Sequence, residues 1–422
     1  MIFIIANIIC FSINSKRKKG GEIMKSSYLL VLFMIVVILV TACVSPTIVE
    51  KEKEEIVAAA DWADQYPDEY SSYLKNAEME RTTYGGSEPI DYLEKYPNLK
   101  IIYAGNGFSK EYLRARGHVY SLEDVIHTAR PKPGASCLSC KTPDYLSMLN
   151  EYGKDFYKMD FDEMAAKAVS PISCYDCHQN TPGEPVITRN HLKTALELVD
   201  KEFKMGDLSC AQCHVEYYLH PETKEVIVPW DNGITVDGIE KTFDDLGYYD
   251  WIHPTTGTPL LKVQHPEFET YQGSLHNKMG LSCIDCHMPK VENDEGDLYR
   301  SHHWTSPLKY VEQSCMSCHT GTSDELIARV EGIQKGVAEK TDEVSDLIVE
   351  LINELTEAVE SKQHSEEFLN LVRSYHRKAQ WRWDFVFVEN STGFHNSQLA
   401  HETLDAARMY AEKGLELLRK QQ

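Results

Sequence analysis

The most regular pattern of apolar and polar positions lies in the C-terminal quarter of the chain. Apolar side chains recur there at three- and four-residue steps, which is the spacing of one helix face. Thr322-x-x-Glu325 is a capping-box pattern that marks the start of a long helix. Residues 366–388 and 397–420 are predicted to form two more helices. The heptad-like spacing favours packing of the first helix against partner helices, through Leu326, Val330, Ile333, Val337, Val344, Leu347, Leu351 and Leu355.

The middle of the chain has no such periodicity. It is rich in Pro, Gly and other turn residues, which predicts short helices joined by long loops. Residues 101–104, Ile-Ile-Tyr-Ala, favour a strand, with little else to pair with it. The expected fold class is therefore mainly α.

A second apolar run, residues 26–42, ends at Cys43. Residues 24–43 are predicted to be a signal peptide, and the residues Val-Thr-Ala-Cys at its end resemble the lipobox of bacterial lipoproteins. Cys43 would then carry a lipid anchor. The alternative is a plain transmembrane anchor, because the run approaches the length that spans a bilayer. Both interpretations place the following chain outside the cytoplasm, in the periplasm or on the outer face of the membrane.

Residues 1–23 are unusual in front of a signal peptide. Lys18 to Ile23 can be back-translated to a purine-rich stretch that resembles a bacterial ribosome-binding site, so we expect translation to start at Met24. Residues 44–60, rich in Glu, Lys and Ala, are predicted to be a tether between the anchor and a folded body at 61–422.

The composition narrows the possible functions. The chain has 65 acidic and 43 basic side chains and a net charge of −22, which argues against binding to nucleic acid. Hydrophobic residues make up 42% of the chain, enough for a packed core. Its 12 cysteines in turn need a specific explanation.

Ten of the cysteines form five C-x-x-C pairs. The pairs are Cys137/Cys140, Cys174/Cys177, Cys210/Cys213, Cys283/Cys286 and Cys315/Cys318. Four of them are followed directly by a histidine, namely His178, His214, His287 and His319. C-x-x-C-H is the attachment signature of c-type haem, in which the histidine ligates the iron. Disulfides or zinc are the alternatives for an exported protein, and the four adjacent histidines count against both.

The first pair is followed by Lys141 instead of a histidine. It could be a degenerate haem site or a disulfide. It could also hold a haem whose proximal ligand is the neutral amine of Lys141, since an iron lowers the pKa of its ligand. In that case four haems would conduct electrons and the lysine-ligated one would carry out chemistry.

With C-x-x-C-K first and four C-x-x-C-H motifs after it, the chain resembles the pentahaem ammonia-forming cytochrome c nitrite reductases, the cytochrome c-552 family. Further motifs that carry the resemblance are Arg116-Gly117-His118, the run from Cys210 to Tyr218, Pro229-Trp230-Asp231 and Lys262-Val-Gln-His-Pro266. The resemblance implies a multihaem cytochrome c fold around five covalently bound haems. It also implies six-electron reduction of nitrite to ammonium at the Lys141 haem, fed by four bis-histidine haems.

The resemblance also assigns roles to single residues. Arg130, Tyr217 and His265 would lie over the Lys141 haem, where a guanidinium and a partly protonated imidazole can hold an anion and supply protons. One calcium ion would be bound by side-chain oxygens of Glu216 and Gln264 and by backbone carbonyls of Tyr217 and Lys262. The distal ligands would be His118 for the third haem, His276 for the fifth, His302 for the second and His395 for the fourth. His303 competes for the place of His302.

The partners follow from the same resemblance. They are nitrite, a membrane tetrahaem quinol dehydrogenase as electron donor, and a second copy bound through the helices of residues 321–422. Only six residues separate Arg130 from Cys137, where the family often has a longer loop, so the shape of the approach to the site stays open.

Two other functions remain open at this point. One is a multihaem electron-transfer cytochrome without a substrate of its own, which would have six-coordinate haems throughout. The other is an enzyme related to octahaem hydroxylamine-oxidising or tetrathionate-reducing cytochromes, although five motifs rather than eight argue against it. Hydroxylamine and sulfite could be side substrates of the same iron.

Overall fold

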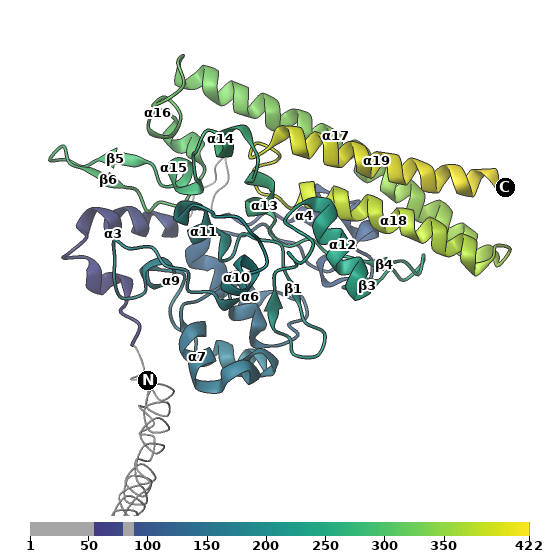
Figure 1. Cartoon of the computed structure of the whole chain (residues 1–422), viewed down its shortest axis with the longest axis horizontal. Coiled ribbons are helices and arrows are strands. Elements are labelled where there is room, and N and C mark those ends of the chain that lie inside the picture. The colour runs from purple at the N-terminus through teal and green to yellow at the C-terminus, as the bar shows by residue number, and fades with distance from the viewer. Residues whose placement is uncertain (1–54, 79–87, 422) are drawn as a thin grey trace, which may run out of the picture. The chain divides into compact units, whose positions relative to one another are not determined.

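Three long helices form the C-terminal part of the protein (Figure 1). The computed structural model describes residues 55–78 and 88–421. Helices α17 (Ser323–Ser361), α18 (Glu366–Phe387) and α19 (Ser397–Lys420) are joined by short connections and pack side by side. The predicted bounds of the last two helices are confirmed to within one residue.

The start of α17 has the predicted capping box. The Thr322 hydroxyl accepts a hydrogen bond from the Glu325 backbone N–H (3.3 Å), and the Glu325 carboxylate accepts one from the Thr322 N–H (2.9 Å). Further along, Val337, Val344 and Leu351 are buried in a cluster shared with α18 and α19. The apolar face of α17 therefore packs against helices of the same chain, so these positions are not available to a second copy.

Shorter helices, many of them a single turn, make up most of the remaining secondary structure. They are η2 (Ala59–Trp62), α3 (Pro67–Leu74), η3 (Lys75–Ala77), α4 (Tyr92–Lys95), α5 (Leu99–Ile102), η4 (Gly107–Ser109), η5 (His118–Tyr120), α6 (Ser121–His127), η6 (Ala135–Leu138), α7 (Asp144–Tyr152), η7 (Gly153–Lys158), α8 (Phe161–Ala165), α9 (Cys174–His178), α10 (Asn190–Leu196), α11 (Met205–Ala211), α12 (Val236–Leu246), α13 (Glu267–Tyr271), α14 (Leu275–Lys278), α15 (Cys283–His287), η8 (Pro307–Tyr310) and α16 (Val311–Ser314).

Strands occur among the described residues only as three short antiparallel hairpins. They are β1 (Tyr218–Leu219) with β2 (Val226–Ile227), β3 (Trp251–Ile252) with β4 (Pro259–Leu260), and β5 (Lys290–Glu292) with β6 (Leu298–Arg300). The prediction of a mainly α fold with long C-terminal helices is confirmed.

Each C-x-x-C pair begins on a short helix or directly after one, on η6, α9, α11, α15 and α16. The helices α9 and α15 contain whole motifs and are capped in the same way. Ser173 and Asp176 form a capping box on α9, and Ser282 and Asp285 form one on α15. The middle residues of these motifs therefore stabilise the local backbone.

The predicted strand at residues 101–104 is wrong. The segment instead ends the helical turn α5, and Ile102 and Tyr103 are fully buried. A short apolar run fits either a strand or a helix, so its surroundings decide. Here the Asn98 side chain, just before α5, donates to Ser345 Oγ (2.8 Å) and Asp346 Oδ1 (2.7 Å) of α17 and holds the turn against that helix.

Residues Glu55–Gln422 form one compact unit. The predictions for an untranslated start, a signal peptide and Cys43 fall on residues 1–54, outside the described residues, and so does most of the tether. Within the described ranges, no helix is both long enough and apolar enough to cross a membrane.

Candidate active site

The five C-x-x-C pairs surround one large cavity. Nine of the ten cysteines line it, all but Cys174, and its volume is about 2270 Å³. A pocket for one drug-sized ligand measures roughly 300–1,000 Å³, so this cavity has room for several large groups. None of the ten cysteines from Cys137 to Cys318 is in a disulfide. The pairs are thus arranged around a shared space rather than cross-linked, as covalently attached haems require.

Each histidine that follows a C-x-x-C pair faces a second histidine from a distant part of the chain. The ring centroids are 6.4 Å apart for His178 and His302, 5.9 Å for His214 and His118, 6.0 Å for His287 and His395, and 6.1 Å for His319 and His276. A metal about 2 Å from one nitrogen of each ring sets the centroids about 6 Å apart. The four pairs therefore have the spacing of two axial ligands on one iron.

These are the four pairings that the resemblance implies. His302, rather than its neighbour His303, lies beside His178. His303 instead forms a hydrogen bond through Nδ1 with the Tyr310 hydroxyl (2.9 Å). The identical residue type at both positions made them hard to separate in the sequence, whereas the backbone places them on different sides.

Burial keeps several of these imidazoles neutral, as metal ligation requires. It lowers the pKa of His118 to about 3, with His214 and Lys141 adding to the effect. It also lowers the pKa of His287 to about 4. His287 Nδ1 donates to the Thr305 carbonyl (3.1 Å), which leaves the other ring nitrogen for the cavity.

Two glutamates lie beside the rings of the paired histidines. Glu267 Oε2 is 3.4 Å from His214 Nδ1, and Glu389 Oε1 is 2.6 Å from His395 Nδ1. Burial opposes a charge on His214, but Glu267 outweighs it and raises the His214 pKa to about 9. A carboxylate at this position fixes the ring and strengthens it as a ligand. Neither glutamate could be predicted from the sequence, because only the fold brings each of them to its histidine.

Arg130, Lys141, Tyr217 and His265 line the same cavity. The Arg130 guanidinium lies over the Phe108 ring, 4.2 Å from its centroid. Burial raises the pKa of Tyr217 well above its usual value and lowers the pKa of His265 to about 4. Near neutral pH, Tyr217 keeps its proton and His265 is uncharged, whereas partial protonation of His265 was expected. Arg130 is thus a positive charge at the cavity wall, beside proton-bearing and proton-accepting side chains.

A buried group of oxygen atoms lies next to these side chains. Glu216 Oε2 accepts from the Gln264 backbone N–H (2.6 Å), and Gln264 Nε2 donates to the Lys262 carbonyl (3.0 Å). Glu216 Oε1 is buried without a hydrogen-bond partner. Burial, together with the charges of Glu269 and Asp250, raises the pKa of Glu216 well above its usual value. A cation would relieve this repulsion, and the oxygen donors suit calcium.

The Lys262 side chain next to this group is paired with Asp384. Its Nζ is 3.0 Å from the Asp384 carboxylate and is almost fully buried. It also lies 4.8 Å from the centroid of the Tyr103 ring. The Asp384 carboxylate thus holds the Lys262 ammonium, and the backbone carbonyl of Lys262 belongs to the oxygen group.

Comparison with known proteins supports the haem interpretation. The family model of cytochrome c552 matches residues 58–422. The chain belongs to the cytochrome c552 family. It is 35% identical over 357 residues to a cytochrome c-552 of Porphyromonas gingivalis, covering 79% of this chain and 70% of that protein. A cytochrome c-552 of Haemophilus influenzae is 33% identical over 383 residues, covering 81% of this chain and 70% of the relative.

A solved structure shows the same fold. It is a cytochrome c nitrite reductase from Desulfovibrio desulfuricans, with a TM-score of 0.80 and 30% sequence identity, covering 88% of this chain and 87% of that one. That protein has two calcium sites in its catalytic subunit. The multihaem cytochrome c fold predicted for the chain is therefore confirmed.

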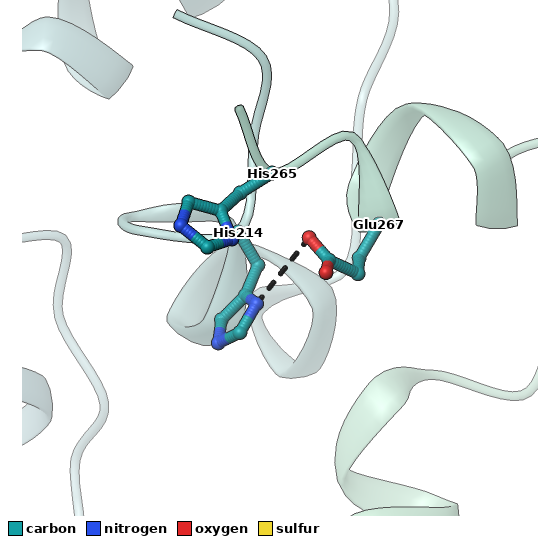
Figure 2. A group of neighbouring side chains, drawn as sticks. All are labelled: His214, His265 and Glu267. Carbon is teal, nitrogen blue, oxygen red and sulfur yellow. Dashed lines mark ion pairs between the residues drawn. The ribbon is translucent and has the colours of Figure 1, made fainter. Parts of the chain in front are cut away.

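The cavity of this cytochrome c552 is also lined by a group of side chains that resembles a metal site. Ligand atoms of His214, His265 and Glu267 lie within 4.8 Å of one another (Figure 2). Two histidines and a carboxylate can hold a non-haem iron. However, His214 Nδ1 pairs with Glu267, and its ring faces His118 across the space for a haem iron. Because both nitrogens of His214 then have partners, the group fits a carboxylate that orients a haem ligand rather than an additional metal site.

Proposed function

We propose that this cytochrome c552 is a nitrite reductase that forms ammonium at a lysine-ligated haem c. The observation that carries the proposal is the position of Lys141. It replaces the histidine of the first motif and lines the same cavity as Arg130, Tyr217 and His265. The other four motifs each have a facing pair of histidines, which suits electron transfer. The nitrite reductase of D. desulfuricans, with the same fold, supports this choice of substrate.

Five haems c would be bound by thioether bonds to the ten cysteines. The proximal ligands would be Lys141, His178, His214, His287 and His319, and the distal ligands His302, His118, His395 and His276 for the second, third, fourth and fifth haems. No distal histidine is assigned to the Lys141 haem, which would leave that iron free to bind nitrite. Neutral histidines such as His118 and His287 are suited to this ligation, and the Thr305 carbonyl holds Nδ1 of His287.

Bound haem would supply an iron that binds nitrite and would relay the electrons that an external donor provides. Nitrite takes up six electrons and eight protons and leaves as one ammonium and two waters. Arg130 would hold the anion through its permanent positive charge. Tyr217 would donate a proton to its oxygen atoms, because Tyr217 retains its proton near neutral pH, and the uncharged His265 would relay protons without holding one.

We further propose one calcium ion at Glu216, Gln264 and the carbonyls of Tyr217 and Lys262. Glu216 precedes Tyr217, and Gln264 precedes His265. The ion would tie the two loops that carry these catalytic side chains, and the unpartnered Glu216 oxygen supports this. Its role would be structural.

The cellular setting is proposed from the sequence. The mature chain would be extracytoplasmic and held to the membrane by a lipid at Cys43, with residues 61–422 as the catalytic domain. A membrane tetrahaem quinol dehydrogenase would deliver electrons. A homodimer would form through residues 321–422, using surfaces other than the buried face of α17.

The decisive experiment measures ammonium produced from nitrite by the purified, haem-loaded protein with a reduced viologen as electron donor. We expect one ammonium per nitrite and six electrons consumed. A fully loaded protein that consumes no nitrite would overturn the proposal and favour the pure electron carrier.

A further inference from the structure

The middle residues of three haem motifs meet at one buried arginine. Arg189, which directly precedes α10, has an exposed fraction of 1%. Its Nε donates to the carbonyl of Ser139, inside the first C-x-x-C pair (2.7 Å). Its Nη2 contacts the carboxylate of Asp176, inside the second pair. These contacts connect two attachment loops through a single side chain.

The third motif joins the same group through Gln212. Gln212 Oε1 accepts from the Arg189 backbone N–H (3.1 Å) and from the Thr188 hydroxyl (2.8 Å). Gln212 Nε2 donates to the carbonyl of Asp176 (3.2 Å). The first three motifs are thus tied together by hydrogen bonds of buried side chains, and partners of this kind are costly to remove.

Arg189 also holds the backbone on both sides of Lys141. Ser139 lies two residues before it, and the carbonyl of Thr142, one residue after it, accepts a second bond from Arg189 Nη2 (3.3 Å). A guanidinium has several donors in a rigid plane, so it can hold two carbonyls and a carboxylate at once. A lysine ammonium in its place would be a compact point charge without this geometry.

We propose that Arg189 is the positioning residue of the Lys141 haem: it fixes the backbone around the lysine ligand and sets its place relative to the second and third haems. This inference rests on the proposed function in that Lys141 ligates an iron. Cys140 Sγ also lies 3.8 Å from the carbonyl of Gln212, inside the third pair. The first and third attachment sites are therefore adjacent, so a displaced loop at Lys141 would change the separation of their haems.

The fourth motif offers a matched control. Asp285 occupies the position of Asp176 in a Ser-Cys-x-Asp-Cys-His segment with the same capping box. Arg300 lies 3.3 Å from the Asp285 carboxylate and donates to the carbonyls of Ile284 (3.1 Å) and Met288 (2.9 Å). This arginine is half-exposed, and these contacts stay around its own motif. The pair Asp285–Arg300 repeats the local chemistry without the link to Lys141.

The test compares the full-length holoprotein variants Arg189→Lys and Arg300→Lys with wild type. Intact mass counts the attached haems, and electron paramagnetic resonance reports the ligand field of the Lys141 haem without any need for nitrite. We expect Arg189→Lys to keep five haems, to change the Lys141 signal and to lower kcat for nitrite about tenfold or more with little change in KM. Arg300→Lys should keep the wild-type Lys141 signal. A fully loaded Arg189→Lys protein with an unchanged signal would overturn the inference.

If Arg189→Lys fails to load its haems, the same resonance measurement on Asp176→Asn and Asp285→Asn tests the inference. Both substitutions weaken a capping box, but only the first removes a charge that orients Arg189. The inference requires that the resonance signal of the Lys141 haem changes in Asp176→Asn and stays as in wild type in Asp285→Asn. Equal signals in the two variants would overturn it. Failure of wild type to reduce nitrite would instead contradict the proposed function, while the spectral comparison would still test Arg189.

Discussion

At the scale of single residues, Lys141 distinguishes the first haem motif from the other four, which have a histidine at this position. The four histidine motifs and Lys141 could be identified from the sequence, because attachment and proximal ligation depend on adjacent residues. Glu267 and Arg189 could not, because their partners come from other segments of the chain, and Glu389 could not, because only the turn between α18 and α19 brings it to His395. The competition between His302 and His303 likewise needed the backbone, which places His303 against Tyr310.

Replacement of the lysine ligand tests the first motif directly. We expect Lys141→His to keep its haem, where maturation tolerates it, and to lower nitrite turnover about tenfold or more, because the axial ligand sets the electronic properties of the iron. Initial rates at equal haem content provide the measurement. Lys154→His, at an exposed lysine paired with Glu225, is the control and should match wild type. Unchanged turnover in Lys141→His would show that lysine ligation is dispensable.

Two adjacent tyrosines allow a matched comparison of proton supply. Tyr217 lines the cavity, whereas the Tyr218 ring packs against Phe243, with centroids 5.5 Å apart. Tyr217→Phe should lower kcat for nitrite about 100-fold, because it removes the proposed proton donor of the reaction. Tyr218→Phe should leave kcat within about twofold of wild type. Equal rates for the two variants in the viologen assay would remove Tyr217 from the proposed mechanism.

At the scale of elements, the long helices were predicted well and the single-turn helices were not. The 3.6-residue periodicity of α17 extends over many turns, and its capping box marks the start. Residues 101–104 offered only a short apolar run, and contacts of Asn98 with α17 decided in favour of a helical turn. Local pattern specifies an element when it repeats, and tertiary contacts specify it otherwise.

The capping box of α17 leads to a prediction about stability. Thr322→Ala removes the acceptor for the Glu325 N–H and should lower the free energy of unfolding by about 1 kcal/mol. Thr322→Ser keeps a hydroxyl and should stay close to wild type. Thermal unfolding followed by circular dichroism at equal haem loading measures both. Equal losses in the two variants would show that the methyl group of Thr322, rather than its cap, stabilises the helix.

At the scale of the whole molecule, bound groups complete the interior. The helices α17, α18 and α19 share an apolar cluster with residues of the N-terminal half, whereas the motif region encloses a cavity of about 2270 Å³. The cysteine motifs in the sequence predicted a region that holds haems, but they did not predict that the attachment sites share one cavity. How far the five attachment sites lie from one another depends on the complete fold.

Removal of calcium should affect the whole protein. Binding to the folded state alone stabilises it, by about 2.7 kcal/mol when free calcium is 100 times the Kd. We therefore expect a chelator to lower the Tm of wild type but not that of Glu216→Gln. Glu222→Gln, at an exposed position, should respond to the chelator as wild type does. A chelator response in Glu216→Gln equal to that of wild type would place the ion elsewhere.

Acid should destabilise the fold partly through His376. Burial, followed by the charge of His253, lowers its pKa to about 3 in the folded protein, against 6.5 for a free imidazole. The unfolded chain binds the additional proton between these values, so stability is lost as the pH falls below about 6.5. Between pH 7 and pH 4 the loss is at most about 3 kcal/mol. His376→Gln should lose less stability than wild type in denaturant titrations over this range, and parallel curves would contradict the assignment.

The facing histidine pairs set an order for biogenesis. His118 comes before every motif and meets His214 of the third, while His395 comes after every motif and meets His287 of the fourth. In the export from the amino terminus proposed above, the His287–His395 pair would not close until nearly the whole polypeptide had crossed the membrane. We would then expect chains that stall before His395 to carry cysteine-attached haems with an incomplete fourth centre, exposed to extracytoplasmic proteases. Secretion and quality control would thereby be coupled to one late residue.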